Sequence, residues 1–206
     1  MSTTAQKPLP IIHLNGFPGT GKLTVAKCLQ KMLGPHGRLV HNHLLINPAD
    51  AVLHRTEPGY QDLRRAIRSA VFSSLAQSAA THAFAYLFTD FQSSDPVGSA
   101  TCAEYLDAAR ARGCSLVSVV MSCDEAANVE RLVTSERRAH GKIVDRELLG
   151  KFRSGVDIHR FDGPDHASLE LDVTQLSAEE AAHRILQHVF KTCPEVERAV
   201  AGGKAS

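Results

Sequence analysis

The stretch that decides the fold is Gly16-Phe17-Pro18-Gly19-Thr20-Gly21-Lys22, which fits the pattern G-x-x-x-x-G-K. It follows a short apolar run, residues 9–14, and precedes a segment, residues 22–33, whose apolar residues recur at helical spacing. Glycines let backbone N–H groups turn inward around phosphate oxygens, because no side chain obstructs them. The N-terminal end of the following helix adds partial positive charge, and the Lys22 ammonium can reach the β- and γ-phosphates of a nucleotide. This stretch, the glycine loop (residues 16–22), therefore predicts a strand, a loop that binds a nucleoside triphosphate, and a helix.

Apolar runs and helical stretches alternate along the rest of the chain. We expect strands at residues 38–46, 83–88, 115–121 and 168–173. We expect helices at residues 60–82, 100–112, 125–161 and 178–191, a loop at residues 48–59, and a frayed tail at residues 199–206. Strands that alternate with helices form parallel sheets covered on both faces, with the loops after the strands at one edge. The sequence predicts a three-layer α/β fold with a five-stranded parallel sheet.

Composition and charge limit the classes of function. The 206 residues are 43% apolar, which suits a single domain with one substantial core. The net charge of +1 provides no overall field for holding nucleic acid or an anionic membrane. Five cysteines without a C-x-x-C pair favour reduced thiols over a disulfide framework or a zinc site. No run approaches the roughly 18 apolar residues that cross a bilayer, so we expect a cytoplasmic protein without a membrane partner.

With Thr24 included, residues 16–24 resemble the phosphate loop of small P-loop kinases. This group holds adenylate, shikimate and gluconate kinases, chloramphenicol phosphotransferase and zeta toxins. The resemblance implies a P-loop NTPase fold with a helical lid, ATP and Mg²⁺ as cofactors, and a small-molecule acceptor. The nucleotide-binding residues that it implies are Gly16, Pro18, Gly19, Thr20, Gly21, Lys22, Leu23 and Thr24. Leu23 departs from the pattern, because many P-loop proteins carry a magnesium-binding Ser or Thr there, whereas Thr24 matches a threonine that contacts a phosphate.

A carboxylate and an arginine-rich segment complete the expected catalytic side. Asp90 follows the apolar run at residues 83–88, where these kinases place a carboxylate near magnesium, a hard cation that prefers oxygen ligands. Thr24 and Asp90 are therefore the candidates for placing the metal, although Asp90 can also merely cap a loop. Residues 131–160 hold eight Lys or Arg against four Asp or Glu. They resemble a lid that closes arginines over the phosphates, although a solvated helix face would show the same charges.

The roles that the resemblance implies can be assigned residue by residue. Lys22, Asp90, Arg137 and Arg138 are the catalytic candidates, and Arg131 is a further nucleotide-binding candidate. Gly141 would act as the hinge of the lid.

The acceptor side is expected at residues 42–82. Some of these kinases carry an Asp after the second strand, as the base, but the sequence here reads Val40-His41-Asn42-His43-Leu44. Either His41 or His43 serves as the base, since imidazole titrates near neutral pH, or Asp50 or Asp90 does, or catalysis depends on positioning alone. The two histidines can equally be ordinary strand residues.

Five residues are the candidates for binding the acceptor: His41, Asn42, His43, Arg64 and Arg68. Arg64 and Arg68 lie one helical turn apart, a spacing that suits a clamp on a carboxylate or phosphate group. Exposed arginines without such a role are the commoner case.

Taken together, these patterns predict a magnesium-dependent kinase that moves the γ-phosphoryl group of ATP to a hydroxyl or phosphate group of a small molecule. Two alternatives stay open. One is a nucleotide-dependent NTPase or switch that acts on a partner, which Leu23 and the missing Asp favour. The other is a kinase-like scaffold that binds nucleotide without chemistry. Only Phe152 and Phe161 lie near the basic lid for stacking bases, so we do not expect nucleic acid as a partner, whereas a homodimer stays open.

Overall fold

The computed structural model describes residues 7–132 and 155–203 of the chain. Its strands are β1 (Ile11–Asn15), β2 (Gly37–His41), β3 (Ala85–Thr89), β4 (Leu116–Ser122) and β5 (Ala167–Asp172). They form one sheet in the order β2-β3-β1-β4-β5, and every neighbouring pair is parallel. The predicted five-stranded parallel sheet is confirmed, and β1, which leads into the glycine loop, lies at its centre.

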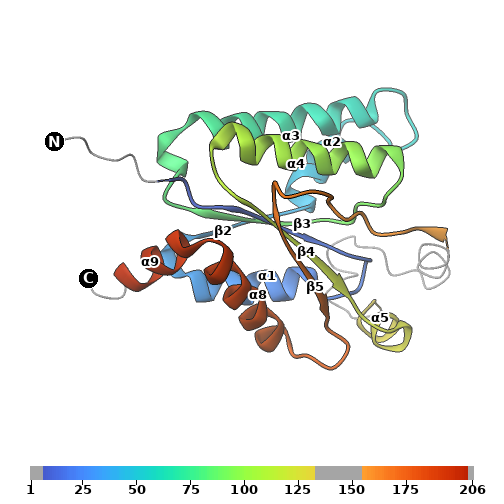
Figure 1. Cartoon of the computed structure of the whole chain (residues 1–206). Helices are drawn as coiled ribbons and strands as arrows, with labels where there is room; N and C mark the ends of the chain where they lie inside the picture. Colours follow the sequence, from blue (N-terminus) through green and yellow to red (C-terminus); the bar gives the residue numbers. More distant parts are fainter. Residues whose placement is uncertain (1–6, 133–154, 204–206) are drawn as a thin grey trace.

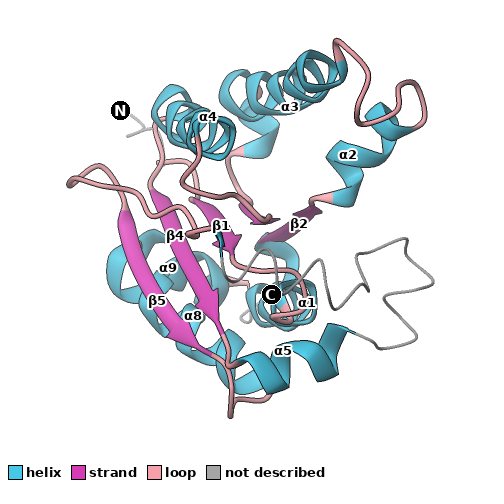
Figure 2. Ribbon diagram, turned by 90° about the vertical axis from the view of Figure 1, so that its right-hand side faces the viewer, coloured by secondary structure: helices cyan, strands magenta, loops and turns pink. Residues whose placement is uncertain are grey.

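Helices cover both faces of this sheet (Figures 1 and 2). One face carries α1 (Lys22–Leu33), α8 (Ala178–Thr192) and α9 (Pro194–Gly202). The other carries α2 (His43–Asp50), α3 (Tyr60–Gln77) and α4 (Pro96–Arg112). Helix α5 (Glu125–Leu132) follows β4, and two short 3₁₀ turns lie at Gly34–His36 and Ala79–Thr81. The predicted three-layer α/β arrangement is thus confirmed in the described residues.

Two apolar cores hold the layers together, one on each face of the sheet. Successive side chains of a strand point to opposite faces, so Ile12 of β1 joins Leu29 of α1 in one core. Its neighbour Ile11 joins Phe72 of α3 and Tyr105 of α4 in the other core. Burying each such side chain contributes roughly 1.5–3 kcal/mol. The two cores fix the position of β1 and therefore of the loop that follows it.

The structure corrects several predicted element boundaries. Strand β2 ends at His41, and the expected end of that strand and part of the expected loop form helix α2. Its buried residues Leu45, Ile46 and Ala49 recur at helical spacing, which outweighs Pro48 within the helix. Helix α4 begins at Pro96 instead of residue 100, because the Asp95 side chain caps it.

The structure also differs from the prediction at the C-terminal ends of two predicted helices and at the C-terminal tail. The helix predicted at residues 60–82 ends at Gln77, and helix α9 (Pro194–Gly202) extends into the tail that was expected at residues 199–206. Residues 157–161, the return segment, are not helical. The backbone N–H of Ser94 donates to Asp157, and that of His159 donates to Gln92, at 2.8 and 3.0 Å. Antiparallel pairing with the chain after β3 thus satisfies these backbone groups in place of a helix.

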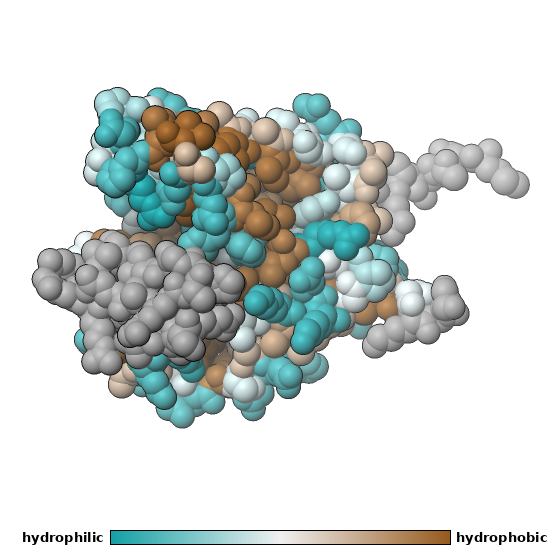
Figure 3. Space-filling model, turned by 180° about the vertical axis from the view of Figure 1, so that it is seen from behind, coloured by the Kyte–Doolittle hydropathy of each residue, from teal (hydrophilic) through white to brown (hydrophobic). Residues whose placement is uncertain are grey.

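The molecular surface is mixed in character. Figure 3 shows, from behind, apolar residues that extend from the upper left toward the centre of this face. In the α2 region, Leu44 is 53% exposed and Val52 is 70% exposed, so this region carries apolar residues outside the core as well. Among the described residues, no helix combines the length and the apolar character needed to cross a membrane.

Candidate functional site

The glycine loop joins β1 to α1 in a backbone conformation that depends on glycine. Gly16, Gly19 and Gly21 all have positive φ angles, of 154°, 91° and 87°. A Cβ atom on Gly16 would lie 2.4 Å from the carbonyl oxygen of Met121, at the end of β4. No side chain fits at that distance, so the loop can approach β4 only with glycine at position 16.

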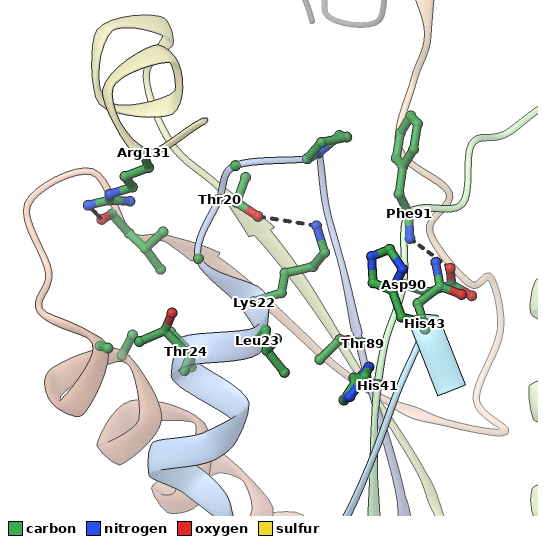
Figure 4. A pocket seen from close by; sticks show the side chains of 18 of the residues that line it. Thr20, Lys22, Leu23, Thr24, His41, His43, Thr89, Asp90, Phe91 and Arg131 are labelled. Carbon is green, nitrogen blue, oxygen red and sulfur yellow. Dashed lines mark hydrogen bonds between the residues drawn. The ribbon is translucent and has the colours of Figure 1, made fainter. Parts of the chain in front are cut away.

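The Lys22 side chain folds back over the glycine loop (Figure 4). Its Nζ donates to the carbonyl oxygens of Gly16 and Phe17, at 2.6 and 2.7 Å, and lies 3.4 Å from Thr20 Oγ1. The Thr20 hydroxyl in turn donates to Phe17. The ammonium therefore lies at the concave side of the loop and at the positive end of α1, where phosphate oxygens would be stabilised.

Two buried asparagines fix the glycine loop from either side. Asn15 Oδ1 accepts hydrogen bonds from the backbone N–H groups of Gly16 and Gln92, at 2.9 and 2.8 Å. Asn128 of α5 donates to the carbonyl oxygen of Pro18 at 2.8 Å. The sequence analysis missed both asparagines, because the contacts of Asn15 with Gln92 and of Asn128 with Pro18 join distant parts of the sequence.

A pocket of about 590 Å³ surrounds the glycine loop. It is lined by predicted site residues from several elements: Pro18, Gly19, Thr20, Gly21, Lys22, Leu23, Thr24, His41, Asn42, His43, Arg64, Asp90 and Arg131. Gly16 and Arg68 are not among the lining residues. Figure 4 shows Arg131 and Thr24 on one side of Lys22, and His41, His43 and Asp90 on the other. The pocket therefore has two ends, which meet at Lys22.

The first end of the pocket combines a cation with apolar walls. The Arg131 guanidinium donates to the carbonyl oxygens of Val173 and Thr174, at 3.0 and 3.2 Å, which fixes it beside the chain after β5. The other lining residues at this end are Val173, Leu176, Ser177, Ala178 and Ala181. The apolar side chains suit the base of a nucleotide, and the guanidinium of Arg131 suits the oxygens of its sugar and phosphates.

Asp90 lies at the second end, directly after β3, and is 3% exposed. Its Oδ1 accepts from the Phe91 backbone N–H at 2.8 Å, and its Oδ2 accepts from Gln92 Nε2 at 2.7 Å and from the Tyr105 hydroxyl at 3.2 Å. Burial, together with the Asp90 charge, raises the pKa of Tyr105, so this hydroxyl stays protonated and can donate. The carboxylate is therefore held in one orientation and retains lone pairs, since its two oxygens can accept about four hydrogen bonds.

The two candidates for the metal do not lie together. Figure 4 shows Thr24 and Asp90 on opposite sides of Lys22. Within residues 7–132 and 155–203, no group of three or more His, Cys, Asp or Glu side chains gathers into a metal-binding cluster. A single carboxylate near nucleotide phosphates nevertheless fits magnesium, which keeps several waters and binds through one or two carboxylates.

The acceptor side differs from its prediction at Arg68. This side chain is 6% exposed and donates two hydrogen bonds to Glu104 of α4, at 2.6 and 2.8 Å. Arg64 lines the pocket and Arg68 does not, so the predicted clamp of these two arginines is wrong. Their spacing places them on neighbouring positions of α3, but the carboxylate of Glu104 takes Arg68 into the interface between α3 and α4. Arg55, which the sequence analysis missed in a loop without periodicity, lines the pocket instead.

Asp50 does not line the pocket and is engaged elsewhere. It accepts hydrogen bonds from the Arg55 guanidinium, at 3.1 and 2.6 Å, and from the Tyr60 hydroxyl at 2.5 Å. The hydrogen bonds from Arg55, and to a lesser extent from Tyr60, lower the pKa of Asp50. A carboxylate with a lowered pKa is a weak base, so Asp50 is a poor candidate for taking the proton of the acceptor.

Most of the lid candidates, among them Arg137, Arg138 and Gly141, lie outside the described residues. Arg160, at the end of the predicted lid, pairs with Glu170 of β5 at 2.8 Å. It therefore does not lie over the glycine loop.

Comparisons with known proteins rest on the structure, because no family model and no curated protein matches the sequence. A sugar kinase from Janibacter is similar with a TM-score of 0.59 and 18% identity, over 92% of this chain and 98% of that chain. A gluconokinase from Sinorhizobium meliloti is similar with a TM-score of 0.58 and 15% identity, over 93% and 97%. Shikimate kinase from Acinetobacter baumannii is similar with a TM-score of 0.53 and 20% identity, over 93% and 99%. With its glycine loop at the centre of a five-stranded parallel sheet, the chain has the fold of the small P-loop kinases.

Proposed function

We propose that the protein is an ATP- and magnesium-dependent kinase that moves the γ-phosphoryl group to a hydroxyl or phosphate group of a small molecule. The observation that carries the proposal is the two-ended pocket, in which Lys22 lies between the Arg131 side and the side with His41 and Asp90. A nucleotide and an acceptor can lie in it end to end, with the transferring group beside the ammonium. The pocket volume is within the roughly 300–1,000 Å³ of small-molecule sites.

The residues of the pocket suit phosphoryl transfer, which is catalysed mainly by positioning and by neutralising charge on the phosphate oxygens. The base of the nucleotide would lie at the apolar end, next to Val173 and Leu176, with Arg131 over its sugar and phosphates. The glycine loop would bind the phosphates through its backbone, and Lys22 would exchange its bonds to Gly16 and Phe17 for bonds to the γ-phosphate. Arg137 and Arg138 stay candidates for further charge neutralisation.

Asp90 suits a role in holding magnesium beside the transferring phosphate. When bound there, magnesium would neutralise charge shared by the β- and γ-phosphates. The hydrogen bonds from Gln92 and Tyr105 keep the carboxylate of Asp90 directed while leaving it free lone pairs for a metal-bound water. Thr24 lies on the far side of Lys22 and would contact a phosphate only.

The base that takes the proton of the acceptor is best sought among His41, His43 and Asp90, all of which line the second end of the pocket. The two imidazoles lie on either side of the boundary between β2 and α2, with their ring centres 6.3 Å apart. An imidazole is a common general base in enzymes. Asp50 is a poor candidate for the base, because it accepts hydrogen bonds from Arg55 and Tyr60.

The experiment that tests the proposal compares two lysines of α1. Lys22→Met should reduce ADP release in the presence of ATP, magnesium and a metabolite extract by roughly 100-fold or more, the scale for losing one catalytic electrostatic contact. Lys31→Met removes an exposed lysine from the same helix and should leave turnover within about twofold. Equal turnover of the wild type and Lys22→Met would refute the assignment.

A nucleotide-dependent NTPase that acts on a partner is the second candidate. Leu23 favours it, because this residue lines the pocket where many P-loop proteins place a metal-binding hydroxyl. The fate of the γ-phosphate distinguishes the two. A kinase delivers it to a second molecule, whereas an NTPase releases it as inorganic phosphate.

A further inference from the structure

Two arginines that do not belong to the nucleotide loop line the second end of the pocket. The charged residues that line the pocket are Lys22, Arg55, Arg64, Arg131 and Asp90. Lys22 and Arg131 belong to the nucleotide side. Arg55 lies before α3 and Arg64 lies on it, and both are near Asp50 and Tyr60, which join the end of α2 to the start of α3. Arg55 and Arg64 are therefore the arginines that can contact a molecule bound at the α2–α3 end of the pocket.

Among residues 7–132 and 155–203, Arg64 has no carboxylate partner, unlike the other arginines of α3. Arg65 and Arg68 both pair with Glu104, at 3.7 and 2.6 Å. The hydrogen bond from Arg55 and, least of the causes, the charge of Arg64 lower the pKa of Asp50, whose oxygens accept hydrogen bonds from Arg55 and Tyr60. Within the described part of the chain, the Nε atom of Arg64 is buried and has no hydrogen-bond partner.

A buried donor without an acceptor is unfavourable, and such groups are rare in folded proteins. The central carbon of the Arg64 guanidinium lies 6.0 Å from the centre of the Tyr60 ring. Arg64 also lines the pocket. An oxygen atom of a bound molecule would satisfy it. Arg55, fixed by two hydrogen bonds to Asp50, offers a second and already oriented guanidinium.

We propose that the acceptor is a small molecule with an anionic group, a carboxylate or a phosphate, that Arg64 and Arg55 bind at the α2–α3 end of the pocket. The role of this molecule as acceptor rests on the proposed kinase function, whereas the anion site itself does not. A guanidinium matches two oxygens of either anion in a fork, with bonds about twice as strong as neutral ones. Asn42, which also lines the pocket, offers an uncharged amide for the other polar groups of the molecule.

The test measures anion binding while the glycine loop is filled. The protein is saturated with magnesium and the non-hydrolysable analogue AMP-PNP, and inorganic phosphate, succinate and the neutral succinamide are then titrated separately by calorimetry. We expect saturable binding of phosphate or succinate and none of succinamide. Tighter binding of phosphate assigns a phosphorylated acceptor, and tighter binding of succinate assigns a carboxylic acid.

Arg64→Met and Arg65→Met form the matched pair, since both remove one positive charge from α3. Arg64→Met should weaken anion binding roughly tenfold or more, the scale for losing hydrogen bonds to a charged group. Arg65→Met should change it less than about twofold, and neither variant should alter the affinity for AMP-PNP, which also reports that they fold. Unchanged anion binding in Arg64→Met, or no saturable anion binding in the wild type, would overturn the proposal.

The same titrations separate this proposal from the kinase assignment. Failure of AMP-PNP to bind would defeat the proposed function. The succinate titration of the protein alone, compared between the wild type and Arg64→Met, would then decide the anion site by the same tenfold criterion.

Discussion

At the scale of single residues, Gly16 and Gly21 show why one glycine of a loop can be more restrictive than another. A Cβ atom on Gly16 would lie 2.4 Å from the carbonyl oxygen of Met121, whereas a Cβ atom on Gly21 would contact nothing within 4 Å. Gly21 is restricted only by its φ of 87°. The position of the neighbouring strand, and not the motif, therefore determines which glycine is hardest to replace.

Gly16→Ala should lower the free energy of unfolding by about 3 kcal/mol, because overpacking against a backbone atom of the sheet forces the loop or β4 to move. Gly21→Ala should lower it by only about 1–2 kcal/mol, the cost of a left-handed conformation for alanine. Urea unfolding of both variants measures the difference. Equal losses would contradict the close contact between Gly16 and Met121.

His13 of β1 is a buried base whose charge the fold does not accommodate. Within the described residues, both of its ring nitrogens lack hydrogen-bond partners, and its ring centre lies 4.3 Å from that of Tyr105. Burial lowers its pKa from the ordinary 6.5 to about 4, against the opposing charge of Asp90. Between these pH values the unfolded chain binds a proton that the folded chain does not, so acid favours unfolding.

Because of His13, the free energy of unfolding should therefore fall by about 3 kcal/mol as the pH falls from 6.5 to 4. Above pH 6.5 His13 is neutral in both states and causes no loss of stability. His13→Leu should remove this part of the pH dependence, and the exposed His54→Gln should leave it unchanged. Urea unfolding at several pH values is the measurement. A pH profile of His13→Leu parallel to that of the wild type would refute the burial argument.

At the scale of elements, α3 and α4 are joined by an ion pair that the sequence does not signal. Arg68 and Glu104 are separated by 36 positions and form two hydrogen bonds. Helical spacing places Arg68 next to Arg64 on α3, but only the packing of α4 determines which of them is buried. This is why the sequence predicted two equivalent arginines and the structure has one in the pocket and one in a helix interface.

Arg68→Met should lower the free energy of unfolding by about 3 kcal/mol, because it removes both hydrogen bonds from Arg68 to the carboxylate of Glu104 in a partly buried interface. Arg65→Met, which removes an exposed and more distant partner of the same carboxylate, should cost less than about 1 kcal/mol. Thermal and urea unfolding compare the two. Similar losses in both variants would mean that the α3–α4 pair contributes little.

The same contrast explains how much of the fold the sequence could predict. The strand, glycine loop and helix around residues 11–33 depend on local chemistry, and their prediction is confirmed. Helix α2 was mistaken for strand and loop, because its eight residues include Pro48 and are too few for a clear period. The return segment was mistaken for helix, because its pairing partner at residues 92–94 is distant in sequence.

At the scale of the whole molecule, the parallel sheet brings distant loops to one edge. The pocket combines the loop after β1 with residues that follow β2, β3 and β5. The nucleotide side could be anticipated because most of its residues are contiguous. The acceptor side could be anticipated only in part, since Arg55, Gln92 and Tyr105 contribute through contacts that arise in the folded chain.

The central claim is that the two ends of this pocket hold a phosphoryl donor and an acceptor. The most direct test follows the γ-phosphate of labelled ATP during incubation with the wild-type protein, magnesium and a metabolite extract. The account predicts that the label appears in a phosphorylated small molecule, and that Lys22→Met abolishes this transfer. Label that appears only as inorganic phosphate, at the same rate with and without the extract, would contradict it.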